Sequence, residues 1–114
     1  MTLNLASVGT KLGPFRHTHR WQDVALYALA VGAGPDDLRY LLEPSPVVLP
    51  TWAVIPAFEP VFAGLDATKC DLVQLLHTAQ RTELLRPLPS SGAASTTAVI
   101  DGIWDMRVGA MIQI

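Results

Sequence analysis

The sequence predicts an α+β domain, with helices in its first half and strands in its second. One observation is the helical spacing of apolar residues from Trp21 to Val31. The other is the alternation of apolar and polar residues from Trp104 to Ile114, which has the period of a strand. Because the two patterns are segregated along the chain, they are typical of the α+β class.

The composition indicates one folded domain, residues 1–114, that is poor in charge. Hydrophobic residues make up 50% of the chain and charged residues 16%, with a mean hydropathy of +0.32. This composition excludes disorder and predicts exposed apolar surface that needs a partner. The formal net charge is -2, and no run of basic residues offers a phosphate-binding surface. Nucleic acid is therefore not expected as a partner.

The sequence gives little sign of secretion or of membrane insertion. Its single cysteine, Cys70, cannot form an internal disulfide, so we expect a cytoplasmic protein. Residues Met1–Ser7 lack the basic and apolar regions of a signal peptide. The longest apolar run, Val24–Gly34, is about half of the roughly 20 residues that a bilayer requires, so no membrane partner is expected.

The first half begins with an extended segment followed by a helix. Phe15–Arg20 alternates and is either a strand or an extended lead into the helix at Trp21–Val31. Asp23 carries the charge that suits a helix N-terminus, and Gly32 and Gly34 supply the C-terminal stop. The predicted buried face of this helix consists of Val24, Tyr27, Ala28 and Val31.

Prolines shape the middle of the chain. Pro35–Glu43 could add a helical turn, after which Pro44, Pro46 and Pro50 force an extended connection. A second helix is predicted to begin at Thr51, whose hydroxyl would cap it. Pro56 is tolerated in the first turn, but Pro60 predicts a short or irregular helix. Its predicted buried stripe consists of Ile55, Phe58 and Phe62.

The second half is predicted to form two antiparallel strands. Leu72–Arg86 is interpreted as a long strand, closed by the turn residues Pro87–Gly92, and Trp104–Ile114 as its partner. The alternating pattern is unfinished at Ile114. We therefore expect a sheet that is incomplete at the C-terminus.

Five blocks of the sequence carry a family resemblance. They are Asp23–Gly32, Tyr40–Glu43, Val48–Ile55, Leu75–Gln80 and Arg86–Pro89. In this order they resemble the N-terminal half of the MaoC-like 2-enoyl-CoA hydratases, the hydratase 2 unit of peroxisomal multifunctional enzyme type 2 and its bacterial relatives. The resemblance extends from Val8 to Ile114.

The resemblance implies a hot-dog fold, in which an antiparallel sheet wraps around a helix and two such units form one enzyme. It also implies (R)-specific hydration of trans-2-enoyl-CoA without a cofactor. The family's catalytic aspartate and histidine lie in an Asp-x-Asn-Pro-x-His segment of the C-terminal hot dog. This sequence has one asparagine, Asn4, and no proline follows it. By this resemblance the chain has no catalytic residue and needs a second hot-dog domain or subunit, in a homo- or hetero-oligomer.

The blocks also suggest contacts for the acyl-CoA. Candidate substrate-binding residues are Trp52, Ile55, Phe58 and His77, with Phe62 as a further apolar wall residue. Core packing is the alternative for the apolar members. His77 is also a candidate base, with Asp71, Asp66 or Glu59 to orient it, or else a strand histidine bonded to backbone. Relatives have His-Gly-Glu-Gln at His77, whereas Thr78 and Ala79 replace the glycine and glutamate here.

Other reactive side chains have weaker functional interpretations. His17 and His19 share one face of a strand and could bind a metal, but solvated polar positions are favoured because no third ligand is evident. Cys70 is interpreted as a buried or inert thiol.

Two further functions remain open. One is a structural or dimerisation module that does not bind acyl-CoA. The other is an independent enzyme that depends on His77.

Overall fold

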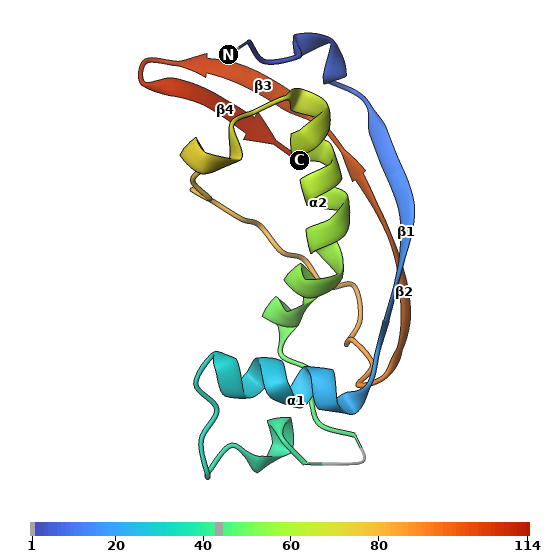
Figure 1. The fold of residues 1–114 in the computed structure, drawn as a ribbon. Helices are drawn as coiled ribbons and strands as arrows, with labels where there is room; N and C mark the ends of the chain where they lie inside the picture. Colours follow the sequence, from blue (N-terminus) through green and yellow to red (C-terminus); the bar gives the residue numbers. More distant parts are fainter. Residues whose placement is uncertain (1, 43–44) are drawn as a thin grey trace. The chain divides into compact units, whose positions relative to one another are not determined.

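The computed structural model describes residues 2–42 and 45–114 (Figure 1). Its described residues form two α-helices and two antiparallel two-stranded sheets, an α+β arrangement that matches a hot-dog half and confirms the predicted class. The helices are α1 (Trp21–Ala30) and α2 (Val54–Thr68); the strands are β1 (Lys11–His19), β2 (Gly92–Val99), β3 (Gly102–Met106) and β4 (Gly109–Gln113). Short 3₁₀ helices occupy Leu5–Ser7, Leu38–Tyr40, Pro50–Ala53 and Leu72–Gln74.

The chain divides into two compact units, which we describe separately. The first unit contains Met1–Phe15, Ala57–Ala79 and Ser95–Ile114, and the second contains Arg16–Pro56 and Gln80–Ala94. One sheet consists of β1 and β2, and the other consists of β3 and β4.

In the first unit, α2 packs through its small residues rather than its aromatic ones. A Cβ at Gly64 would lie 2.9 Å from Cδ1 of Ile114 and 3.4 Å from Cδ1 of Leu12, so the helix backbone approaches these side chains closely. Along the whole of α2, Pro56, Pro60, Gly64 and Thr68 are buried at every fourth residue, which is the spacing of one helical face. Leu65, beside Gly64, is buried as well.

Two expectations about α2 are therefore wrong. Phe58 and Phe62 are 52% and 48% exposed instead of buried, because the proline and glycine face occupies the core side. Pro60 lies inside a helix of 15 residues rather than shortening it. The missing N–H of Pro60 costs one helical hydrogen bond, and burial of its ring offsets that loss.

The expectation that the Thr51 hydroxyl caps α2 is wrong. Thr51 lies inside the 3₁₀ helix Pro50–Ala53, which precedes α2 and is preceded in turn by Leu49. Proline at the first helical position needs no amide partner, so Pro50 begins this turn without a side-chain cap.

The final alternating segment is a hairpin, so the prediction of a single strand at Trp104–Ile114 is wrong. The chain reverses at residues 107–108, and Trp104 pairs with Met111. Because the turn has two residues, each even-numbered residue of β3 pairs with an odd-numbered residue of β4. Paired residues point to the same face of the hairpin, so the even-numbered residues of the two strands point to opposite faces. Trp104 and Met106 therefore face the side opposite to Ala110 and Ile112.

The predicted long strand at Leu72–Arg86 is also wrong. Only Leu72–Gln74 is regular there, as a 3₁₀ helix, and residues 72–87 are all exposed. An extended segment becomes a strand only when another strand satisfies its backbone, and none pairs with this segment among the described residues. The strand that pairs with β1 is instead Gly92–Val99, whose small residues carry little apolar alternation in the sequence.

In the second unit, α1 confirms the predicted helix and its stop at Gly32. Gly32 has a φ of +111°, and its N–H donates to Leu29 while the N–H of Ala33 donates to Ala28. This pair of bonds is a Schellman motif, which glycine permits at no steric cost. Val24 and Ala28 are buried as predicted, whereas Val31 is 56% exposed.

The remaining expectations concern the edges of these elements. The extended segment at Phe15–Arg20 belongs to the longer strand β1. The turn expected at Pro35–Glu43 is a 3₁₀ helix at Leu38–Tyr40. Two residues of this region, Glu43 and Pro44, lie outside the described residues. The last residue of the Tyr40–Glu43 block is one of them.

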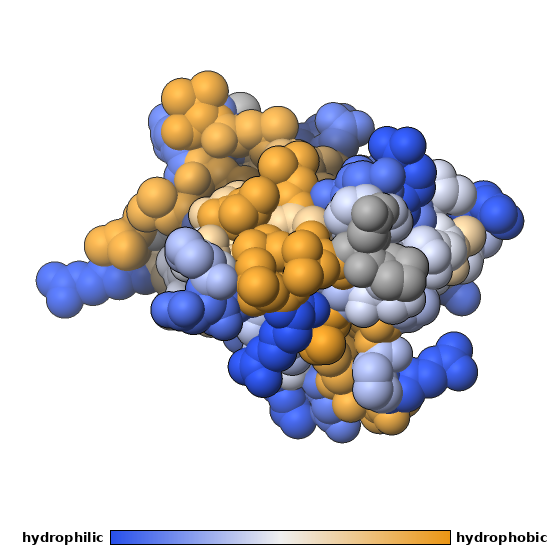
Figure 2. Space-filling view, turned by 90° about the horizontal axis from the view of Figure 1, so that it is seen from below, coloured by the Kyte–Doolittle hydropathy of each residue, from blue (hydrophilic) through white to orange (hydrophobic). Residues whose placement is uncertain are grey.

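Apolar side chains remain on the surface, as the composition predicts. Figure 2 shows orange apolar groups exposed among hydrophilic ones on the face that it views. Val73, Leu76, Leu85 and Val108 are each more than four-fifths exposed. No helix among residues 2–42 and 45–114 is long and apolar enough to cross a membrane.

Candidate functional site

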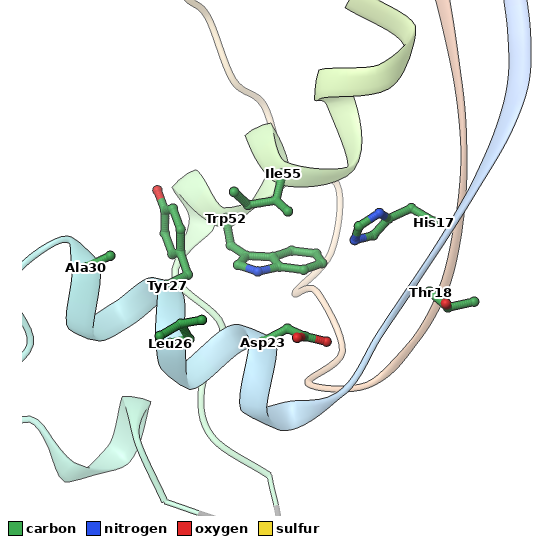
Figure 3. Close-up of a pocket in the computed structure, with 8 residues that line it drawn as sticks. All are labelled: His17, Thr18, Asp23, Leu26, Tyr27, Ala30, Trp52 and Ile55. Atoms are coloured by element: carbon green, nitrogen blue, oxygen red, sulfur yellow. The ribbon is translucent and has the colours of Figure 1, made fainter.

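A pocket of about 400 Å³ lies within the second unit (Figure 3). Strand β1, helix α1, the Pro50–Ala53 turn and the start of α2 each contribute to its wall. Its lining residues are His17, Thr18, Asp23, Leu26, Tyr27, Ala30, Trp52 and Ile55. The wall is thus chiefly apolar and aromatic, with a few polar side chains.

Trp52 is the central residue of this pocket. Figure 3 shows its indole between Tyr27, Ile55 and His17. Trp52 is only 1% exposed, and its ring centroid lies 4.3 Å from that of His19. The residue therefore serves the core and the pocket wall at once, because one edge of a large buried ring reaches the cavity.

Two hydrogen bonds fix the α1 side of the pocket. The hydroxyl of Tyr27 donates to Oγ1 of Thr51 at 2.9 Å. The backbone N–H of Arg20 donates to Oδ2 of Asp23 at 2.8 Å, so this carboxylate satisfies an amide at the helix start. Asp23 thus supports the helix N-terminus, as its charge predicted, and lines the pocket as well.

His17 and His19 share one face of β1, as their spacing predicts. Their ring centroids are 6.4 Å apart in a stacked arrangement. His19 is 6% exposed, and its Nε2 donates to the carbonyl of Pro89 at 2.9 Å. The expectation of solvated histidines is therefore wrong for His19, because Trp52 covers it. The described residues contain no cluster of three or more histidine, cysteine, aspartate or glutamate side chains that could hold a metal.

The structure brings together two of the four predicted substrate-binding residues. Trp52 and Ile55 line the same pocket, whereas Phe58 and His77 do not. Phe58 lies on the exposed side of α2, with its ring 6.2 Å from that of Phe62.

His77 lies in the exposed segment that follows Gln74. Its Nε2 donates to the carbonyl of Ala79 at 3.1 Å, which is the backbone bond of the alternative interpretation, although the segment is not a strand. Among the described residues no carboxylate bonds to His77: Oδ1 of Asp71 accepts the N–H of Val73 instead. None of the three carboxylates considered for orienting His77 therefore bonds to it in the described chain.

Cys70 is half-buried and is not one of the residues that line the pocket. Its thiol donates to the carbonyl of Leu65 at 3.6 Å. This contact gives the thiol a structural role.

Sequence reasoning missed Leu26 and Ala30 as pocket residues. Neither residue belongs to the predicted buried face of α1, and Leu26 is 67% exposed. A signal was present: α1 is apolar around most of its circumference from Val24 to Ala30, which is unusual for a helix with one solvated face.

Comparisons with known proteins match the sequence of this chain to one family. The model of the MFE-2 hydratase 2 N-terminal domain matches residues 15–114. Enoyl-CoA hydratase ChsH3 of Mycobacterium tuberculosis is 34% identical over 93% of this chain and 40% of its own length. 3-Hydroxyacyl-thioester dehydratase Y of the same organism is 35% identical over 96% of this chain and 39% of its length. The peroxisomal multifunctional enzyme type 2 of Mus musculus is 34% identical over 95% of this chain and 16% of its length.

Proposed function

Because this chain belongs to the family of MFE-2 hydratase 2 N-terminal domains, we propose that it is the non-catalytic, acyl-accommodating hot-dog unit of an (R)-specific trans-2-enoyl-CoA hydratase. In this proposal residues 1–114 are one N-terminal-type hot dog. A second hot-dog domain or subunit supplies the catalytic aspartate and histidine, and no cofactor takes part. The chain spans about 40% of the length of its hydratase relatives, which supports a partner of this kind.

The pocket around Trp52 is the observation that carries the proposal. Its volume of about 400 Å³ falls in the range of small-molecule sites. Leu26, Ala30 and Ile55 offer the apolar contacts that a hydrocarbon chain needs, at about 0.8 kcal/mol for each buried methylene. An acyl chain bound here would lie against Trp52 while its thioester is held by the catalytic hot dog.

The absence of a catalytic set among the described residues supports the non-catalytic role. Hydration of an enoyl thioester needs a base to activate water and donors to hold the thioester oxygen. Oδ2 of Asp23 accepts a bond at its own helix start, and Asp23 forms no hydrogen bond with His17 in the described chain. The amide of Asn4, the single asparagine, donates to the carbonyl of Ala67.

Three expectations remain predictions beside this proposal. Contacts of Phe58 and His77 with the acyl-CoA would have to form outside the pocket. The third is the cytoplasmic location, which is expected from the single cysteine, Cys70.

A substitution that fills the pocket tests the proposal. Ala30→Trp places a large ring into the pocket wall, whereas Gln22→Trp adds the same ring to an exposed position of α1 outside it. The hydratase formed by this chain and its catalytic hot dog should show a KM for long-chain enoyl-CoA that rises about tenfold or more with Ala30→Trp, since several methylenes lose contact. The KM for crotonyl-CoA should not change. An equal KM of the two variants for the long-chain enoyl-CoA contradicts the proposal.

The competing function is a dimerisation module without acyl binding. The exposed, stacked rings of Phe58 and Phe62 favour it, because such a surface is typical of a contact between proteins. Calorimetric titration with a long-chain enoyl-CoA, with and without the catalytic partner, separates the two functions. Binding supports the acyl-accommodating unit, and absence of binding in both titrations supports the module.

A further inference from the structure

We propose that His17 is a specificity-determining residue of the pocket and selects acyl groups that carry a hydroxyl on an otherwise apolar chain. This inference rests on the proposed function. It adds the chemical class of acyl group that the pocket prefers, and it assigns that preference to one side chain.

The imidazole of His17 lies at the pocket wall and is not bonded to any described residue of the protein. It is half-buried, its ring centroid lies 6.2 Å from that of Trp52, and it forms no hydrogen bond with any residue in the described parts of the chain. A neutral imidazole carries one N–H donor and one acceptor nitrogen. Figure 3 shows its ring directed toward Trp52. A ligand in the pocket is therefore placed to bond with it.

The other polar side chains of the pocket are less available. The hydroxyl of Tyr27 donates to Thr51, and Oδ2 of Asp23 accepts the N–H of Arg20. Thr18 follows His17 in β1, so its side chain projects to the other face of the strand, as Figure 3 shows. Among the polar side chains of the pocket, His17 is thus the best placed to form a hydrogen bond with the ligand.

The surrounding charges and apolar groups select a hydroxyl over other polar groups. A hydroxyl can donate to one ring nitrogen or accept from the other, so it matches a neutral imidazole in either tautomer. The carboxylate of Asp23 lines the same pocket and disfavours an acyl chain that ends in a second carboxylate. A methyl group against His17 would offer the imidazole no hydrogen bond.

The test measures the affinity of this chain, bound to its catalytic hot dog, for dodecanoyl-CoA and for dodecanoyl-CoAs hydroxylated at carbon 8, 10 or 12. At least one hydroxylated probe should bind about three- to tenfold more tightly than the plain one, the gain of one hydrogen bond. A probe that ends in a carboxylate at carbon 12 should bind more weakly than the plain one. His17→Phe should remove the hydroxyl preference, and His17→Gln, which keeps a donor and an acceptor, should retain it.

A control variant and three outcomes make the test decisive. Gln22→Phe makes a polar-to-aromatic change on the exposed side of α1 and should keep the preference. Equal affinity for plain and hydroxylated probes overturns the role of His17 and leaves the acyl pocket standing. A preference that survives in His17→Phe also overturns that role. Failure of every probe to bind overturns the proposed function together with the inference.

Discussion

The hydroxyl of Tyr27 donates a 2.9 Å hydrogen bond to Oγ1 of Thr51, and this bond joins α1 to the short helix that carries Trp52. Both residues flank the pocket, one in its wall and one beside its central indole. The bond therefore couples the position of a helix to the position of the largest pocket side chain.

Tyr27→Phe should destabilise the protein modestly. The substitution keeps the ring and removes one hydrogen bond, whose net value is about 0.5–1.5 kcal/mol, with the lower end expected because the bond is exposed. Urea denaturation measures the change in unfolding free energy. Tyr40→Phe is the matched control, because the described contact of Tyr40 is made by its ring, under Arg39. An equal loss in both variants would show that the Tyr27 bond contributes nothing.

Trp52→Ala should be far more costly. Removal of a buried aromatic side chain costs about 3–5 kcal/mol, and Trp52 is 1% exposed. Trp104→Ala removes the same side chain from a strand position that is 42% exposed, so its cost should be clearly smaller. Thermal unfolding of the two variants compares them. A similar shift in Tm would mean that Trp52 is not a core residue.

Substitution by alanine should change the stability of the protein differently at the two glycines after α1. Gly32→Ala forces a Cβ into the left-handed region at φ +111° and should cost about 1 kcal/mol. Gly34 has no positive φ and only an ordinary contact with Asp37, so Gly34→Ala should be neutral or slightly stabilising. Chemical denaturation measures the unfolding free energy of both variants. Destabilisation by Gly34→Ala alone would contradict this assignment of the helix stop.

The elements with strong local signals were predictable from sequence. Helix α1 has a helical apolar period and a glycine stop, and both are properties of neighbouring residues. The pairing partner of β1 was not predictable in this way. It is a strand of small residues at Gly92–Val99, whereas the apolar Leu72–Arg86 segment remains irregular and exposed. Strand formation depends on a partner that is distant in sequence, which periodicity cannot identify.

The candidate site was predictable only in part, for a related reason. Trp52 and Ile55 were identified because large apolar residues in a resembling block suggest an acyl wall. His17, Leu26 and Ala30 join them only through the packing of β1 and α1 around Trp52. Phe58 was expected in the same wall, but the proline and glycine face of α2 turns it outward.

The decisive measurement is the rate at which the purified chain alone hydrates crotonyl-CoA, with near-ultraviolet circular dichroism to confirm that the chain is folded. The chain contains no Asp-x-Asn-Pro-x-His segment, and none of its carboxylates bonds to His77 in the described residues. We predict no hydration above the uncatalysed rate by the folded chain, and hydration once the catalytic hot dog is added. Hydration by the chain alone at a rate comparable with that of complete hydratases would contradict the proposal that it is the non-catalytic unit.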